Sequence, residues 1–260
     1  MNRIDAKWKA LREAGRKGFV AFLTAGDPDI KQSEADIRLA LDNGVDILEL
    51  GVPFSDPTAD GPVIQAASLR ALESGMNLEQ VLDLVRRIRQ DYDQPIVLFG
   101  YVNLFFRYGY ERLARDAAAA GVDGILVVDL PYEERGEIAA ALAAHGLHRI
   151  ALAAPTTSKE RLGMILSDAA GFVYYIMVTG VTGARQSVRE DLQERLAMLH
   201  AVTDLPIAVG FGVTNGEQAA AVAASADAVV VGSALITAAR AGRLGDLVQD
   251  IRGSIDRAVS

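Results

Sequence analysis

Residues 49–62, ELGVPFSDPTADGP, contain the carboxylate of this sequence that is best placed for chemistry. Glu49 stands inside an apolar run, and strand alternation would put it on the same face as Ile47 and opposite Leu48. On a face that points into an enclosed site, burial raises the pKa of a carboxyl group toward neutrality. Such a pKa suits a residue that both accepts and donates a proton, so Glu49 is our candidate for acid–base catalysis. The alternative is a structural carboxylate that backbone donors or an arginine satisfy.

Glycine marks the ends of three later apolar runs, at T179-G-V-T-G183, G210-F-G212 and G232-S233. Glycine lets the backbone approach a ligand closely and aim successive N–H groups at one anion. Ser233 also leads into a short helical stretch, and free N–H groups at a helix start bind phosphate. These positions favour a phosphate site, and the alternative is that the glycines only form tight turns. Asp129 ends another run before a proline, where a turn cap and a functional role are equally open.

The residue types that are scarce narrow the chemistry further. The sequence has no cysteine, so thiol nucleophiles and thiolate metal sites are excluded. None of the five lysines lies inside a predicted strand, which argues against a Schiff base, and the three histidines lack metal-ligand spacing. Acid–base chemistry by carboxylates on a phosphorylated substrate is what remains.

Eight short apolar runs alternate with helix-periodic segments, and these elements must position the candidate residues. The predicted strands are residues 18–24, 46–52, 95–101, 124–130, 148–154, 172–178, 205–211 and 227–233. The predicted helices include residues 33–44, 78–90, 110–121, 134–146, 159–171, 189–202 and 215–225.

This order is typical of a (β/α)8 TIM barrel, and we predict a single domain over residues 1–260. An extra N-terminal helix and a short extra helix after the eighth strand complete the prediction. A doubly wound sheet is the rival fold, but it needs fewer strands, and no G-x-G-x-x-G motif follows the first strand. In such barrels the active site lies at the C-terminal ends of the strands, where Glu49 and the glycine segments stand.

Composition limits the partners and the compartment. The formal net charge is -8 and the basic residues are scattered, so nucleic acid is not an expected partner. The charged N-terminal segment has no long apolar core, and the longest apolar stretch, residues 219–239, is interrupted by Ser225 and Asp227. We therefore expect no membrane partner and a cytoplasmic location.

Six segments together resemble one enzyme family, the tryptophan synthase α subunits. They are F19-V-A-F-L-T-A-G-D-P28, E49-L-G-V-P-F-S-D-P-T-A-D-G-P-V-I-Q65, D129-L-P-Y-E-E134, T179-G-V-T-G-A184, G210-F-G-V213 and V231-G-S-A234. The resemblance covers almost the whole chain, in order and spacing, and residues 49–65 are its most specific part. It implies a carbon–carbon lyase of L-tryptophan biosynthesis that cleaves indole-3-glycerol phosphate, by a retro-aldol reaction, to indole and D-glyceraldehyde 3-phosphate.

The resemblance also implies roles for individual residues. Glu49 would move a proton between the glycerol hydroxyl and indole C3, and Asp60 would accept a hydrogen bond from the indole N–H. The substrate's indole and glycerol parts would contact Phe22, Phe99, Leu126, Tyr174 and Thr182. The phosphate would be held by Gly183, Gly212, Gly232 and Ser233. No metal or cofactor is implied for this chain.

A partner follows from the same resemblance. A pyridoxal-phosphate-dependent β subunit would receive the indole in an α2β2 complex, and Pro53, Asp56 and Asn103 match positions that face it. For Pro53 and Asp56 the alternative is plain turn chemistry. Other functions stay open beside this one. They are another phosphate-binding barrel lyase or isomerase, such as a lyase that releases indole without a partner, an idle subunit that only activates a partner, and a glycosidase that uses two carboxylates.

Overall fold

Parallel strands form a nearly closed barrel in the computed structural model, which describes residues 1–177, 185–210 and 212–258. The strands follow one another around the ring in the order β5-β4-β3-β2-β1-β9-β8-β7-β6, and every pairing is parallel. Their bounds are β1 Gly18–Thr24, β2 Ile47–Gly51, β3 Ile96–Gly100, β4 Gly124–Val127, β5 His148–Arg149, β6 Ala151–Ala153, β7 Val173–Ile176, β8 Ile207–Gly210 and β9 Ala228–Val231. The predicted (β/α)8 barrel is confirmed.

The fifth predicted strand, residues 148–154, is divided. Its first part, β5, pairs with β4, and its second part, β6, pairs with β7. Ile150 lies between the two parts, and its N–H donates to the carbonyl of Ile125 at 3.0 Å. The ring therefore passes from one neighbour to the other within a single chain segment, and the nine short strands fill eight positions of the barrel.

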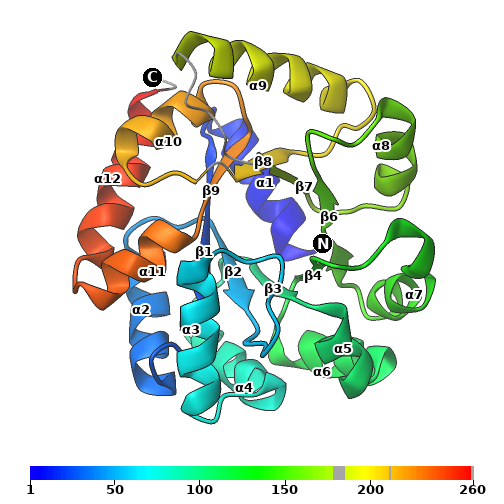
Figure 1. Cartoon of the computed structure of the whole chain (residues 1–260), viewed down its shortest axis with the longest axis vertical. Helices are drawn as coiled ribbons and strands as arrows, with labels where there is room; N and C mark the ends of the chain where they lie inside the picture. Colours follow the sequence, from blue (N-terminus) through cyan, green and yellow to red (C-terminus); the bar gives the residue numbers. More distant parts are fainter. Residues whose placement is uncertain (178–184, 211, 259–260) are drawn as a thin grey trace.

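The chain's helices lie around the strands as an outer ring, apart from the N-terminal helix, which lies behind the strands at the centre of the view (Figure 1). They are α1 Arg3–Glu13, α2 Ile30–Asp42, α3 Pro62–Glu73, α4 Leu78–Ile88, α5 Val102–Tyr108, α6 Tyr110–Ala120, α7 Gly136–Ala144, α8 Lys159–Leu166, α9 Arg185–His200, α10 Gly216–Ala223, α11 Ser233–Arg240 and α12 Leu244–Arg257, with a 3-10 turn η1 at Tyr132–Glu134. The extra helix α11 after the last strand is confirmed. Helices α3 and α5 add to the predicted ones, and α3 begins at a proline, which fits the first helical position. Within the described residues, no helix is long and apolar enough to cross a membrane.

The predicted N-terminal helix, α1, closes the end of the barrel at which the strands begin, which we call the lower end. Its buried face, Ile4, Trp8 and Leu11, belongs to the same apolar cluster as inward-facing residues of the strands, among them Val20 and Ile47. A second and larger cluster lies between the strands and the outer helices. With both faces of the sheet covered, the strands read as nearly continuous apolar runs, which is why they were recognisable in the sequence.

Candidate active site

Glu49 lies on β2 with its side chain on the inner face of the barrel. Ile47, two residues before it, belongs to the inner cluster, whereas Leu48 and Leu50 belong to the outer one. The predicted alternation is therefore confirmed. Glu49 is 0% exposed, and neither carboxyl oxygen has a hydrogen-bond partner among the described residues. Burial without a partner raises the pKa of Glu49 from 4.5 to about 8.

Three aromatic side chains, from β1, β3 and β7, form a connected row of rings whose two ends neighbour Glu49. Phe22 is the β1 partner of Glu49 in the strand register, and its ring meets the ring of Phe99 edge-on at 5.0 Å. Phe99 in turn lies 6.4 Å from the ring of Tyr174 on β7. Neighbouring glycines make room for these rings, because a Cβ on Gly51 would lie 2.5 Å from Phe22 and one on Gly210 would lie 2.9 Å from the Tyr174 hydroxyl. An apolar wall of this kind suits a flat aromatic ligand.

Asp60 is carried by the loop between β2 and α3, and the structure ties its carboxylate down. The Tyr101 hydroxyl donates to Asp60 Oδ2 at 2.9 Å. Burial raises the pKa of Asp60, and the hydrogen bond from Tyr101 acts in the opposite direction. The side chain of Gln65, on α3, also donates to the Asp60 carbonyl at 2.8 Å. The loop is therefore held at both its side chain and its backbone.

Glu49 and Asp60 act on the same neighbour, Tyr174. Burial raises the pKa of the Tyr174 hydroxyl well above its ordinary value, and the charges of Glu49 and Asp60 raise it further. A group on β2, a group on the loop after it and a tyrosine from the far side of the barrel thus share one electrostatic environment. This convergence links the two candidate carboxyl groups although they lie on different elements.

The glycine-bearing strand ends are described only in part. Gly232 precedes α11, and Ser233, the first residue of that helix, is exposed. The N–H of Leu235 is the first in this turn to reach the Gly232 carbonyl, so the earlier N–H groups have no acceptor within the helix. Gly212 has a φ of +62°, a conformation that favours glycine. Thr182 and Gly183 lie outside the described residues.

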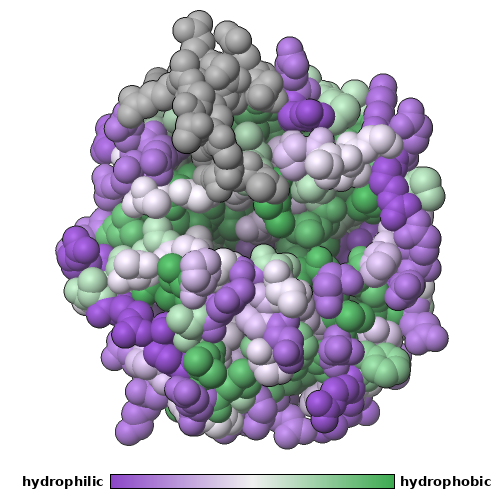
Figure 2. All heavy atoms as spheres, viewed as in Figure 1, coloured by the Kyte–Doolittle hydropathy of each residue, from purple (hydrophilic) through white to green (hydrophobic). Residues whose placement is uncertain are grey.

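Leu126, on β4, is fully buried in the inner cluster and is the register partner of Phe99. Figure 2 shows apolar residues gathered across the middle of the face that looks onto the strands, with hydrophilic residues around them. An apolar band across the middle of this face is compatible with the apolar lining expected for an indole.

The three residues assigned to a partner surface differ in exposure. Asp56 and Asn103 are exposed, and Pro53 is buried within the chain. Asp129, whose role was open, accepts a hydrogen bond from the Val102 N–H at 2.7 Å and so caps the first turn of α5. The hydrogen bond of Asp129 therefore goes to the start of α5, and not to the turn that follows Asp129 in the sequence.

Two residues near the site carried no predicted role. Tyr101 ends the third predicted strand, and its contact with Asp60 spans 41 positions of sequence, which no local pattern can indicate. Thr24 shares a strand face with Phe22, and its buried hydroxyl has no hydrogen-bond partner among the described residues. The described residues include no group of three or more His, Asp or Glu side chains suited to a metal ion.

A parallel barrel that encloses a fully buried carboxyl group, with no hydrogen-bond partner among the described residues, is typical of an enzyme of the (β/α)8-barrel class. Within that class, the chain belongs to the tryptophan synthase alpha chain family, whose sequence profile matches residues 8–251. Members of this family are carbon–carbon lyases of tryptophan biosynthesis that cleave indole-3-glycerol phosphate.

Individual relatives agree with this assignment over nearly their full length. The tryptophan synthase alpha chain of Geobacter sulfurreducens is 50% identical over 249 residues, which cover 94% of each chain. A crystal structure of the alpha chain from Legionella pneumophila subsp. pneumophila superposes with a TM-score of 0.90 at 38% identity, covering 99% of this chain and 98% of that one. A structure of Mycobacterium tuberculosis tryptophan synthase gives a TM-score of 0.91 at 37% identity, with 98% of both chains covered.

Proposed function

We propose that this chain performs the α reaction of tryptophan synthase with Glu49 as the proton shuttle and Asp60 as the acceptor for the indole N–H. The observation that carries the proposal is the wholly buried Glu49 carboxyl group, which has no hydrogen-bond partner in the part of the chain that the structure describes and whose pKa is raised by burial to about 8. A carboxyl group in this state is protonated at neutral pH and can act first as an acid.

The reaction then follows in two proton transfers. Glu49 donates its proton to indole C3, which leaves the ring nitrogen positively charged and weakens the bond from C3 to the glycerol side chain. As that bond breaks, its electron pair returns to the ring, the adjacent hydroxyl loses its proton to the Glu49 carboxylate, and the aldehyde carbonyl forms. The shuttle ends in its starting state, and the indole ring itself serves as the electron sink. No cofactor in this chain is required by the scheme.

Asp60 contributes where the positive charge develops. A carboxylate that accepts the indole N–H gains strength as the ring becomes cationic, so it stabilises the transition state more than the bound substrate. Phe22, Phe99, Leu126 and Tyr174 would hold the ring, and Thr182 would also contact the substrate. At the other end, Gly183, Gly212, Gly232 and Ser233 would hold the phosphate, supported by the free N–H groups at the start of α11.

The pH dependence of cleavage tests the two carboxyl roles. We expect a bell-shaped profile of kcat/KM, because Glu49 must be protonated and Asp60 ionised in the free enzyme. The basic limb should lie near pH 8, and Glu49→Gln should abolish cleavage while the substrate still binds. A profile that is flat through pH 9, or cleavage by Glu49→Gln, would refute the shuttle. The exposed Glu73→Gln serves as the matched control and should leave the profile unchanged.

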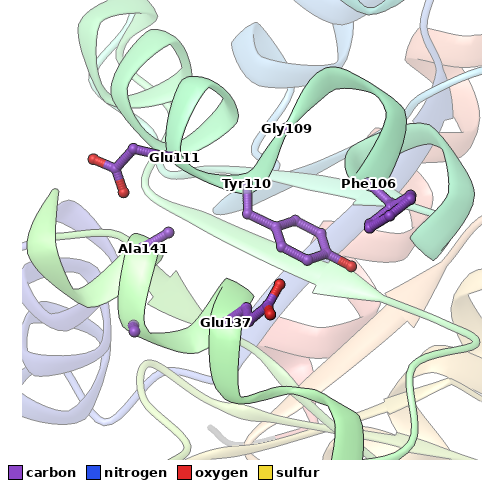
Figure 3. A pocket seen from close by; sticks show the side chains of 7 residues that line it. Phe106, Gly109, Tyr110, Glu111, Glu137 and Ala141 are labelled. Carbon is purple, nitrogen blue, oxygen red and sulfur yellow. The ribbon is translucent and has the colours of Figure 1, made fainter.

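A β subunit that carries pyridoxal phosphate is the partner we propose, docked on the face that contains Asp56 and Asn103 in an α2β2 complex. Beside Asn103 on α5, Phe106 is 64% exposed, and its ring meets that of Tyr110 at 6.0 Å. Figure 3 shows Tyr110 between Phe106 and Glu137 in a pocket at the junction of α5, α6 and α7. The exposed Phe106 ring beside the partly buried Tyr110 ring supports a binding face, because aromatic side chains dominate protein interfaces. Pro53, which is buried, would act by supporting the loop that carries Asp56.

Sedimentation of the chain with a purified β subunit tests this partner. Phe106→Ser should weaken the complex by about tenfold or more, as expected for an aromatic side chain at the centre of an interface. The control is Leu39→Ser, which changes a hydrophobic residue of α2 that is 41% exposed. If this chain releases indole rapidly by itself, and the β subunit neither binds the chain nor accelerates the release, the lyase that works without a partner is favoured.

A further inference from the structure

Tyr101 stands between β3 and α5, and contacts of its ring and of the adjoining backbone hold it in place. The residue is 3% exposed, and its ring stacks on the ring of Phe54, with 5.0 Å between the ring centres and an interplanar angle of 29°. The N–H of the next residue, Val102, donates to Asp129 at the end of the neighbouring strand. A ring packed on one face and pinned through its backbone has little freedom to move its hydroxyl.

The hydroxyl of Tyr101 makes two hydrogen bonds, and the first fixes the direction of the second. It accepts from the Ala59 N–H at 3.1 Å and donates to Asp60 Oδ2 at 2.9 Å. Because a phenol has one proton, that proton is committed to the carboxylate. Burial and the nearby Asp60 charge raise the pKa of Tyr101 well above its ordinary value, so the hydroxyl stays a donor throughout the pH range of the enzyme.

We propose that Tyr101 is a positioning residue, which holds the Asp60 carboxylate ionised and oriented toward the indole ring of the substrate. The inference rests on the proposed role of Asp60 and adds the group that makes that role possible. Without a partner, a carboxylate on a loop turns freely, and a half-buried one becomes protonated more easily. One hydroxyl, shared between the Ala59 backbone and the Asp60 side chain, fixes both the loop and the charge.

Other titratable groups lie near Tyr101 and Asp60 and influence their charges. Tyr174 faces Asp60 from β7 and Glu49 shares that environment from β2, while the charge of Asp129 acts on Tyr101 from the end of β4. Among the described residues, Tyr101 is the group whose hydrogen bond lowers the pKa of Asp60. Its removal should therefore shift the titration of Asp60 upward, because burial then acts alone.

The test compares Tyr101→Phe with Tyr92→Phe. Both changes remove one hydroxyl that donates to an aspartate, since the Tyr92 hydroxyl donates to Asp42 at 2.8 Å, on a different part of the molecule. The probes are glyceraldehyde 3-phosphate and an uncleavable substrate analogue in which hydrogen replaces both glycerol hydroxyls. Tyr101→Phe should weaken the analogue about tenfold and leave glyceraldehyde 3-phosphate unchanged, because the affected contact lies at the indole end. Tyr92→Phe should change neither.

Two further readouts separate positioning from a merely structural role. In an Asp60→Asn background, Tyr101→Phe should cost less than about twofold, because its effect passes through the missing carboxylate. In the single variant, the acidic limb of kcat/KM and the NMR titration of the Asp60 carboxyl carbon should both move to higher pH. Equal losses in the two backgrounds, or an unmoved titration, would overturn the inference. A wild-type chain that fails to bind the analogue would instead overturn the proposed function.

Discussion

Replacement of Glu49 by glutamine tests whether burial, and not a partner, sets the protonation of this carboxyl group. Burial raises the folded-state pKa of Glu49 from 4.5 to about 8. The unfolded chain returns the carboxyl group to its ordinary pKa, so unfolding releases a proton at any pH between these values. Stability that is fully present below pH 4.5 is therefore lost as the pH rises toward 8. The Glu49→Gln variant has no ionisable group at this position, so position 49 makes no pH-dependent contribution to its stability.

The size of the effect follows from the pKa difference. Between the two pKa values, the unfolding free energy of the wild-type chain should fall relative to Glu49→Gln by about 1.4 kcal/mol per pH unit. The accumulated difference is about 3 kcal/mol at pH 7 and levels off near 5 kcal/mol above pH 8. Because Glu49 is 0% exposed, solvent screening does not reduce this figure. The buried amide of glutamine adds an offset that is independent of pH, so the slope is the quantity to compare.

Urea unfolding at pH 5, 6, 7, 8 and 9 measures this slope, with the fluorescence of the single tryptophan, Trp8, as the signal. Trp8 packs at the lower end of the barrel and reports the loss of the fold. The exposed Glu73→Gln on α3 is the matched control and should run parallel to the wild type. A difference between Glu49→Gln and wild type that stays constant with pH would show that the carboxyl group is ionised and paired in the fold, which would refute the reasoning.

Two further substitutions test the packing around the site and the frame of the barrel. Gly210→Ala should lower kcat/KM about tenfold or more with the fold intact, because its Cβ would lie 2.9 Å from the Tyr174 hydroxyl; Gly136→Ala, which meets nothing within 4 Å, is the kinetic control. Arg252→Ala should lower the unfolding free energy by about 2 kcal/mol in urea titrations, because buried Asp46 loses its 2.9 Å partner and keeps only the more distant Lys7 at 3.7 Å as a cation. The exposed Arg240→Ala should change it by less than about 0.5 kcal/mol.

The strands and the inward face of β2 were predictable because their signals are local. Alternation over Ile47, Leu48 and Glu49 is enough to place the carboxyl group on one face, and burial on both sides of the sheet produces the apolar runs. The division of residues 148–154 was not predictable, because it depends on which neighbour each half pairs with across the ring. The prediction of a single domain over residues 1–260 stays a prediction.

Asp60 shows where local reasoning ends. Its own segment indicates only a loop with prolines, and its role came from the family resemblance. Its partner, Tyr101, comes from another strand end, 41 positions away, and carries no motif of its own. A hydrogen bond between two loop-borne groups is decided by how the strand ends meet in space, so only the folded chain can show it.

The proposed chemistry also explains why the two carboxyl groups lie on different kinds of element. Glu49 has to be neutral at the start of the reaction, and a position inside a strand of the barrel removes both water and partners, which raises its pKa. Asp60 has to be ionised, so it needs partial access to water and a donor, and a loop at the mouth supplies the first while Tyr101 supplies the second. Exchanging the two environments would give each group the wrong protonation state at neutral pH. Two similar carboxyl side chains are thus held in different states in this scheme. Burial keeps Glu49 protonated, and the hydrogen bond from the Tyr101 hydroxyl keeps Asp60 ionised.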